Sequence, residues 1–545
     1  MEYVVVSSFP GSIFYNMGDI NLFAFFLSTH SLREPTNSKR NNDSRMATII
    51  GVQRSYQRWS LDELSTELLV LILEQLKDVD PRSLGIARLV STRFNAIVTP
   101  MKYHTIRMTQ YIVDPRAETF FPGGIANICA HTRHVKVDSD LNAEHIKRVL
   151  DKLERLSSIS WRYVQDELCK GDFWVPSDIL PLRHIQSGKV RLYIENLPLQ
   201  DFRSELYNPY LRAIPTGILV SLMTATPTRL LTARVESLKG LLLESPRLET
   251  FRYDDRGQGT QFGFSGNERL PAFKELSLRS YHWNHSSTTV LQHWDFSRIR
   301  RLEMIDVPLG PFLNSVCFAD FQHLDTLRLD DFSAHPPNRR PDTTRGQYLF
   351  IKQIRALIDL KITCHIPSFP IDGILQHARS IRSLRFRDYT GFTDEHHRCP
   401  TVRVEDLDTM SRELVNLRTI ELDMDERCCE PHHFLRTLCN FRQLNALTLH
   451  IQTALDPLQD TDANIDLDYG RAMQILSLLV QGKQAALWHS ITINVGGWKP
   501  IMMRRFSAPW RELYSRGLYA ERCFVMEKQE SGALEVREEL PIRAS

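Results

Sequence analysis

The residues best suited to chemistry are cysteines and histidines gathered in the second half of the chain. Segment 428–433 (CCEPHH), followed by Cys439, is the densest group of thiol and imidazole side chains, the ligand types that zinc prefers. His396, His397 and Cys399 lie shortly before it. The spacing fits no zinc finger or ribbon, and two adjacent cysteines are poorly placed to bind one ion. We therefore expect ordinary thiols and histidines here, and no metal site.

Other patterns that could carry a ligand or a reaction are incomplete. Segment 460–466 spaces carboxylates like a calcium loop, but Ile465 stands where glycine is needed and Arg471 where glutamate is needed. Gly257 and Gly259 lack the lysine and hydroxyl residue of a phosphate-binding loop. No nucleophile-elbow pattern occurs. The sequence thus predicts a protein that is not an enzyme and uses no cofactor; a hidden hydrolase or metalloprotein is the alternative that elemental analysis would expose.

Composition restricts the class of protein further. The chain has 545 residues with 42% hydrophobic content and a net charge of +2. It is too long for one compact core, which predicts several domains or an elongated repeat. The balanced charge predicts no nucleic-acid and no membrane partner. Nine scattered cysteines without a C-x-x-C pair predict reduced thiols in a cytoplasmic and/or nuclear protein.

The first 58 residues do not have the pattern of a folded domain. The apolar stretch 21–28 is shorter than the roughly 20 residues of a membrane span, and no basic residue precedes it as in a secretory signal. The following stretch, 33–45, is polar and is expected to be disordered. Met46 is an alternative start.

The stretch from residue 64 to residue 106 predicts three short helices. Ser65, Asp80 and Ser91 are suited to be their N-caps, and Pro100 is expected to close the unit. The first helix has leucine and isoleucine on more than one side, so it can pack on two sides. Three helices in about 45 residues are near the lower size limit for folding alone. The second apolar side is therefore expected to be a docking surface.

Spaced positions in this stretch form one pattern: a Leu-x-x-Glu-Leu-Leu helix start, an Ile-Leu…Leu segment and a Leu-Val-Ser…Arg-Phe helix. They are Leu64, Ser65, Thr66, Glu67, Leu68, Leu69, Ile72, Leu73, Leu76, Pro81, Leu84, Leu89, Val90, Ser91, Arg93 and Phe94. This pattern resembles the F-box. It departs from the family in having Ser65 where proline is usual and a slightly long turn at 77–80, while Tyr103 lies near a frequent tryptophan position. The alternative is an unrelated helical cap on a larger domain.

The F-box resemblance implies a partner and a set of contact residues. The partner is a Skp-type adaptor, and through it a cullin. Carried over position by position, the adaptor-facing residues are Leu64, Ser65, Leu68, Ile72, Leu76, Leu84, Val90 and Phe94. Serine at position 65 does not preset the chain at the helix start as proline would, which lowers the affinity that the resemblance implies.

From about residue 130 a short phrase recurs: an apolar residue, two spacers, an apolar residue, one spacer and an apolar residue. The clear copies begin at Leu248, Phe273, Ile299, Leu324, Leu357, Ile381, Leu417, Leu444 and Trp488. The alternation that ends each copy predicts a strand with one buried side. Helical patterns lie between copies, at 143–156, 234–243, 348–357, 405–414 and 470–487.

One strand and one helix per unit, stacked to share a core, resemble the leucine-rich repeat. The asparagine or cysteine that usually follows the strand is mostly missing, and the copies are 24 to 44 residues apart. The predicted solenoid is therefore irregular, with inserted loops at 257–267, 335–347, 387–400 and 453–469. An ordinary α/β domain with alternating strands and helices is the alternative.

The expected fold class is an α/β repeat, in which a small three-helix F-box is followed by an irregular leucine-rich-repeat solenoid. Two closing strands are predicted at 523–526 and 533–536, as a hairpin that covers the open edge. The expected domains are a disordered segment 1–58, an F-box 59–107, a solenoid 108–521 and a hairpin cap with tail 522–545.

One position in each phrase is expected to face a binding partner. The residue between the last two apolar positions points away from the core and, in a curved solenoid, lines the concave side. These residues are Lys136, Ser160, Arg191, Arg252, Ser277, Glu303, Arg328, Lys361, Arg385, Glu421, Thr448 and Thr492. Six of them, Arg252, Glu303, Arg328, Lys361, Arg385 and Glu421, are the expected substrate-facing residues. Three consecutive basic ones (328, 361 and 385) would suit an acidic or phosphorylated segment; a solvated charged face is the alternative.

The two resemblances together imply a function. An F-box followed by leucine-rich repeats is a known domain order, and the irregular repeats are similar to those of many F-box proteins in filamentous fungi. The order implies the substrate-recognition subunit of a cullin-RING (SCF-type) ubiquitin ligase, which holds an unknown protein substrate close to the ubiquitin-charged enzyme. The alternative is a leucine-rich-repeat interaction scaffold without ubiquitin-ligase coupling.

Overall fold

The computed structural model of the chain forms two compact units, residues 1–64 and residues 65–545. The structure describes residues 61–164, 176–197, 211–225, 235–254, 260–331, 337–389, 399–452, 467–484, 487–495, 522–529 and 532–539. The predicted N-terminal segment 1–58 lies outside the described residues. In the first unit the described part is the short 3₁₀ helix η2, Leu61–Glu63, and the residue that follows it.

The second unit begins with three helices, α2 (Thr66–Val79), α3 (Pro81–Ala87) and α4 (Thr92–Tyr103). Each starts at a predicted N-cap. Ser65 Oγ accepts the backbone N–H of the third residue after it at 3.4 Å, and Ser91 Oγ does the same at 3.2 Å. Side-chain caps of this kind satisfy N–H groups that have no partner inside the helix.

The prediction that Pro100 closes this helical unit is wrong. Pro100 lies inside α4, which continues to Tyr103. A proline removes one backbone hydrogen bond from a helix. In α4 the loss is tolerated because the helix packs against α2 and α3 on one side and against α7 (Pro122–His131) on another.

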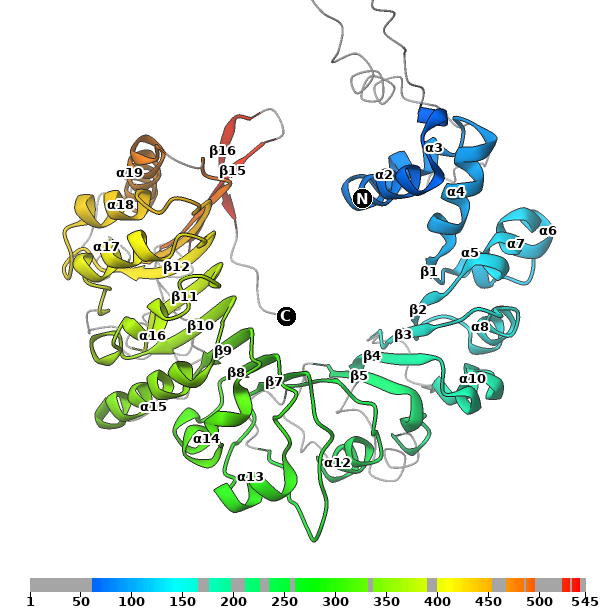
Figure 1. The fold of residues 1–545 in the computed structure, drawn as a ribbon, viewed down its shortest axis with the longest axis horizontal. Coiled ribbons are helices and arrows are strands. Elements are labelled where there is room, and N and C mark those ends of the chain that lie inside the picture. The colour runs from blue at the N-terminus through cyan, green and yellow to red at the C-terminus, as the bar shows by residue number, and fades with distance from the viewer. Residues whose placement is uncertain are drawn as a thin grey trace, which may run out of the picture. The chain divides into compact units, whose positions relative to one another are not determined.

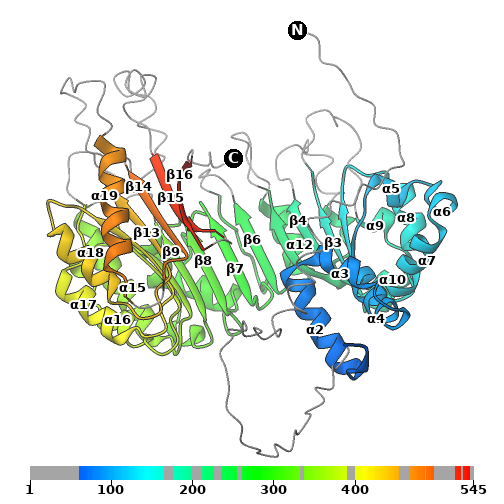
Figure 2. The same cartoon turned by 90° about the horizontal axis from the view of Figure 1, so that it is seen from above.

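A single sheet follows, in which the strands lie side by side in chain order (Figure 2). Strands β1 to β14 are parallel, and β15 and β16 are antiparallel. The strands are β1 Thr105–Arg107, β2 His134–Asp138, β3 Ser158–Arg162, β4 Arg191–Leu197, β5 Leu219–Thr224, β6 Thr250–Asp254, β7 Glu275–Arg279, β8 Arg301–Ile305, β9 Thr326–Asp330, β10 Asp359–Cys364, β11 Ser383–Asp388, β12 Thr419–Met424, β13 Ala446–Ile451, β14 Ser490–Val495, β15 Arg522–Lys528 and β16 Leu534–Glu539.

Helices connect most of the parallel strands and cover one side of the sheet, which leaves the other side to strand residues (Figure 1). The remaining α-helices are α5 Gln110–Val113, α6 Ala117–Phe120, α8 Ala143–Leu150, α9 Pro176–Ile179, α10 Leu182–Ser187, α12 Val235–Leu243, α13 Ser287–His293, α14 Leu309–Ser315, α15 Arg340–Gln353, α16 Asp372–Leu375, α17 Val404–Glu413, α18 Pro431–Cys439 and α19 Leu467–Gly482. Short 3₁₀ helices are η3 Thr216–Ile218, η4 Phe318–Phe321, η5 Pro337–Arg339 and η6 Ile366–Ser368.

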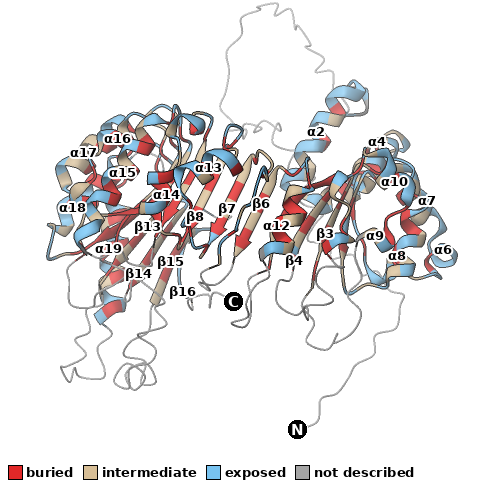
Figure 3. Cartoon of the chain, turned by 90° about the horizontal axis from the view of Figure 1, so that it is seen from below, coloured by how far each residue is buried: buried red, intermediate tan, exposed pale blue. Residues whose placement is uncertain are grey.

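The core is one continuous layer between the sheet and the helices (Figure 3). The apolar positions of the recurring phrase supply it: Leu327 and Leu329 of β9, for example, are both fully buried. Between β6 and β8, where residues 260–274 contain no helix, aromatic rings such as Phe262 and Trp294 fill the layer. The fold class of the chain is thus α/β, with every parallel strand contributing to the same core.

The predicted helix 348–357 and the predicted loop 335–347 are misplaced. Helix α15 begins at Arg340, with Pro341 and Asp342 in its first turn. Proline fits the first turn, where its missing N–H is not needed, and a carboxylate there is favoured by the helix dipole. At the other end of the chain, the predicted closing strands are present as β15 and β16, and Gly532 takes a positive φ of 84° at the turn between them.

Two general predictions concern thiols and membranes. The eight described cysteines are all free. Among the described residues, no helix combines the length and the apolar character that crossing a membrane would require.

Candidate functional site

Helix α2 has an apolar stripe that the rest of the second unit does not cover. Leu68, Leu71 and Ile72 are 50%, 57% and 46% exposed, and Val79 continues the stripe. At about 100° per residue these positions lie on one side of the helix, while buried Leu69 lies on another side, where α2 meets α3 and α4. The helix is therefore apolar on a packed side and on an open side.

Further apolar side chains are exposed at the end of α3 and in the turn after it, namely Ile86, Leu89 and Val90. The structure places Leu84 and Phe94, two of the predicted adaptor-facing residues, in the interior between the helices, so they support the surface and do not line it. The carry-over by pattern could not separate these roles, because the buried and the exposed positions both carry large apolar residues.

The other predicted contact residues have mixed positions. Ser65 is the exposed N-cap of α2, and Leu76 is half-buried at its inner side. Leu64 is the last residue of the first unit. A side-chain hydrogen bond of 3.2 Å from Arg93 to Thr66 ties α4 to the start of α2 and holds the open side in place.

On the sheet, the six predicted substrate-facing residues occupy one row across adjacent strands. The strand register pairs Arg252 with Ser277, Ser277 with Glu303, and so on through positions 328, 361, 385 and 421. All six are half-buried and lie on the side that the helices leave open. The row continues to Thr448 and Thr492 on β13 and β14.

On β4 the residue in the row differs from the predicted one. Arg191 pairs with Ser158, so the residue beside Ser160 in the row is Tyr193. The register then shifts between Leu192 and Tyr193, where β4 meets β5. The apolar alternation continues through Val190, Leu192 and Ile194, so it left open whether Arg191 or Tyr193 belongs to the row, and the phrase at 190–192 predicted the wrong one.

The basic residues of the row are not free charges. Asp330, two residues after Arg328 on β9, is fully buried and contacts Arg328 Nε at 2.6 Å and Arg385 Nη1 at 2.7 Å. It also accepts a hydrogen bond from Thr363 Oγ1 at 2.9 Å. Lys361 lies 3.4 Å from Asp359. Each of the three cations therefore has a carboxylate partner, and their role in binding an acidic segment stays a prediction.

A second part of this ion-pair network joins β11, β12 and β13. Glu421 lies 3.1 Å from Arg385 and accepts from His450 Nε2 at 2.8 Å. Burial alone would raise the pKa of Glu421, but the hydrogen bond from His450 and the charge of Arg385 outweigh it and lower the pKa well below its ordinary value. Burial lowers the pKa of His450, which favours its neutral form. Arg387 completes the network through Asp423, at 2.8 Å.

Sequence reasoning missed four members of this network: Asp330, Arg387, Asp423 and His450. They are the residues two positions after the predicted row, and in a strand such residues point to the same side. The alternation would have located them. Their burial was not predictable in the same way, because it depends on neighbouring strands that are 24 to 36 residues away in the chain.

Buried carboxylates at the ends of two strands, β9 and β11, bind the backbone of the neighbouring unit. Asp331 Oδ2 accepts the N–H of Leu309 at 3.1 Å, and Asp388 Oδ2 accepts the N–H of Ile366 at 2.8 Å. Cys364, fully buried, occupies the position beside Asp388 on β10. In both cases a buried aspartate satisfies a backbone donor of the preceding turn.

The cysteine and histidine group does not assemble a metal site. Among the described residues, no group of three or more His, Cys, Asp and Glu side chains could hold a metal ion. Glu430 is the N-cap of α18, which places His432 and His433 in the first helical turn. Cys439 is buried and donates to Leu479 O at 3.5 Å. His396, His397, segment 460–466, Gly257 and Gly259 lie outside the described residues.

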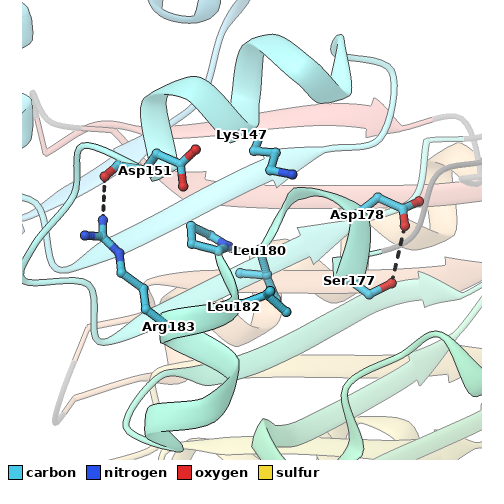
Figure 4. A pocket seen from close by; sticks show the side chains of 8 residues that line it. Lys147, Asp151, Ser177, Asp178, Leu180, Leu182 and Arg183 are labelled. Carbon is cyan, nitrogen blue, oxygen red and sulfur yellow. Dashed lines mark hydrogen bonds between the residues drawn. The ribbon is translucent and has the colours of Figure 1, made fainter.

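A shallow hollow of about 710 Å³ lies on the helix side, between α8, α9 and α10 (Figure 4). Lys147, Asp151 and Asp178 surround it, and Arg183 donates to the backbone of Asp151 at 2.5 Å. Its charged groups have both signs and are exposed to solvent. The hollow therefore offers no buried, convergent polar groups of the kind that bind a small ligand.

Comparison with protein-family models and with curated protein sequences finds no match for this chain. Function must therefore be argued from the two surfaces described above, the open apolar side of α2 and α3 and the polar side of the sheet.

Proposed function

We propose that this protein is the substrate-recognition subunit of an SCF-type ubiquitin ligase, with helices α2 to α4 as an F-box that docks on a Skp-type adaptor. In this proposal the sheet and its helices form an irregular leucine-rich-repeat solenoid that binds a protein substrate. The protein would act as a receptor and leave the ubiquitin transfer to its partners. The observation that carries the proposal is the exposed apolar stripe on α2, within a stretch whose spaced residues resemble the F-box.

The stripe suits a protein partner better than water. Fully burying a leucine or isoleucine contributes about 1.5 to 3 kcal/mol, so covering the half-exposed Leu68, Leu71 and Ile72 would contribute about 1 kcal/mol each. Exposed apolar side chains on one side of an amphipathic helix are a usual docking mode between proteins. The caps at Ser65 and Ser91 fix the helices before binding, which lowers the entropy lost on docking.

Two features support a repeat architecture for the sheet. Parallel strands follow one another in chain order, with helices between most of them. The carboxylates of Asp331 and Asp388 bind the backbone of the preceding unit, so at these two places one unit satisfies a donor of its neighbour. In repeat proteins such contacts between neighbours are the main source of stability.

The decisive experiment is co-purification with a Skp-type adaptor. We expect the full chain to co-elute with the adaptor and the variant Leu68→Asp with Ile72→Asp to lose it, because two buried carboxylates would oppose docking. The matched control changes two exposed leucines on other helices, Leu182→Asp with Leu291→Asp, and should co-elute like the wild type. Circular dichroism must show that all three proteins are folded. Co-elution that survives the first double change would sink the proposal.

One observation favours the scaffold alternative. Helix α4 packs against α7, and the carbonyl of His104 accepts the N–H groups of Arg133 and His134, so the helical unit is joined to the first strands. If α2 to α4 only cap the sheet, deleting residues 65–103 should unfold or aggregate the remainder, and no Skp-type adaptor should bind the wild type. If they are a docking module, the deletion should abolish adaptor binding. The remaining chain should stay folded, with the circular dichroism signal of its strands and helices retained.

A further inference from the structure

Unpaired positive charge gathers at a place other than the predicted row, at the edge where the parallel strands begin. The turns that lead into β8, β10, β11, β12 and β13 carry six exposed arginines: Arg300, Arg355, Arg379, Arg382, Arg418 and Arg442. Because parallel strands all begin at the same edge of a sheet, these side chains belong to one border. We call this set the basic edge. Within the described residues, none of the six forms an ion pair with a carboxylate.

The basic edge brings like charges close together. Arg418 donates its backbone N–H to Arg382 O at 2.8 Å, so the two residues are direct neighbours. Like charges on neighbouring strands destabilise a sheet. The described carboxylates of this border are Asp295, Asp320, Asp325, Asp359 and Glu413. Asp295 and Asp359 are paired with Arg269 and Lys361, and Asp325 is half-buried and hydrogen-bonded to Thr326. None of these carboxylates forms an ion pair with the six arginines within the described chain.

The opposite ends of the same strands have the opposite character. There Asp330, Asp388 and Asp423 are buried carboxylates, and the arginines beside them are paired. Although the net charge of the chain is only +2, exposed arginines lie where these strands begin and buried, paired carboxylates lie where they end. Free cations without internal partners that line one border create a field that attracts an anionic ligand.

We infer that the basic edge is a docking site for an acidic segment of a protein, and that the substrate of the proposed ligase carries this segment. That the ligand is a ligase substrate rests on the proposed function. That the ligand is acidic rests on the exposed arginines of the basic edge. From β8 to β13 the border crosses five strand intervals of about 4.8 Å, or about 24 Å. An extended peptide of about eight residues, at about 3.3 Å per residue, would span it.

Apolar side chains on the same border decide between kinds of anion. Ile358 precedes β10 and Val415 precedes β12, and they are 43% and 37% exposed among the arginines. An acidic peptide with aliphatic residues would use both features. Single-stranded nucleic acid would need aromatic side chains on which its bases could stack, and the described turns into these strands expose aliphatic residues instead.

The test uses the full chain and a labelled peptide of about eight residues that repeats Glu-Glu-Leu, followed by fluorescence anisotropy at about 150 mM salt. We expect saturable binding that weakens with added salt. The variant Arg382→Glu with Arg418→Glu should bind at least about tenfold more weakly, because attraction becomes repulsion. The matched control Lys147→Glu with Arg345→Glu changes the net charge equally on exposed helix positions and should bind like the wild type.

Two results would contradict the docking site or its ligand. Absence of peptide binding, or equal weakening in both variants, would refute a specific site at the basic edge. Tighter binding of a single-stranded oligonucleotide with the same charge would refute a protein ligand in favour of nucleic acid. Co-elution with the Skp-type adaptor is measured in parallel and should be unchanged in the Arg382 and Arg418 variant. Loss of adaptor binding in the wild type would refute the ligase role while leaving the peptide result to decide the docking site.

Discussion

The substitution Asp330→Asn examines the ion-pair network directly. Asp330 is fully buried and receives Arg328, Arg385 and Thr363 at 2.6, 2.7 and 2.9 Å. Asparagine keeps the shape of the side chain and removes its charge. The change leaves Arg385, whose side chain is 12% exposed, with Glu421 as its remaining carboxylate in the described network.

The size of the effect follows from burial. Removing one partner of a buried ion pair costs about 3 to 5 kcal/mol, because the other charge remains desolvated. Arg328 is more exposed and Arg385 keeps Glu421, so we expect the lower value, about 3 kcal/mol. The matched control is Asp138→Asn on β2, which also joins two arginines, but these are 57% and 39% exposed. Exposed pairs contribute about 1 kcal/mol or less.

Hydrogen exchange measured by mass spectrometry can locate this loss. A free energy of about 3 kcal/mol corresponds to about 150-fold faster exchange of the amides of β9 to β11. The Asp138 variant should change exchange in β2 and β3 by less than about tenfold. Equal effects of the two substitutions would refute the reasoning from burial. The double variant with Arg385→Met should lose less than the sum of its single changes, since it removes both members of a pair.

Three further predictions concern stability. Burial lowers the pKa of His377 from 6.5 to about 4. The free energy of unfolding should therefore be unaffected by this group above about pH 6.5 and should fall as the pH drops toward 4. At about pH 5 the loss should be about 2 kcal/mol. In His377→Phe this part of the slope in thermal unfolding should vanish, and an unchanged slope would contradict the assignment. A Cβ on Gly373 would lie 2.9 Å from a ring carbon of Tyr348, so Gly373→Ala should lower unfolding stability by about 1 to 3 kcal/mol, whereas Gly470→Ala, in open space, should not. Asp388→Ala leaves a buried N–H without its acceptor and should cost about 1 to 3 kcal/mol in urea unfolding, most of which Asp388→Asn should restore if the hydrogen bond is the cause.

Local patterns predicted the elements whose causes are local. The caps Ser65, Asp80 and Ser91 each start a helix, since capping depends on residues within one turn. The strand alternation located β6 to β14, because a residue that is buried on one side of a strand is followed two positions later by another. Pro341 was also a local signal for the start of α15, and it was overlooked in favour of the apolar spacing after residue 348.

What depended on neighbouring units could not be predicted in this way. Whether Arg385 is free or paired depends on Asp330, which is 55 residues earlier and two strands away. The burial of Leu84 and Phe94 depends on how three helices pack. The shift beside Tyr193 depends on the register of β4 against β5. Each of these needs contacts across the chain that a single phrase does not contain.

Whether an arginine is paired also depends on contacts between neighbouring strands. Carboxylates at the ends of β9, β11 and β12 are buried, and a buried carboxylate requires a partner, so it neutralises any arginine on the nearby strand positions. The six arginines in the turns before the strands are exposed and, within the described residues, form no ion pair with a carboxylate. Counting basic residues would favour the row through Arg328 and Arg385, whereas counting unpaired ones favours Arg382 and Arg418. Asp330→Asn separates the two views: it would add charge to the row and leave peptide binding at the basic edge unchanged, while a marked gain in binding would move the docking site back to the sheet.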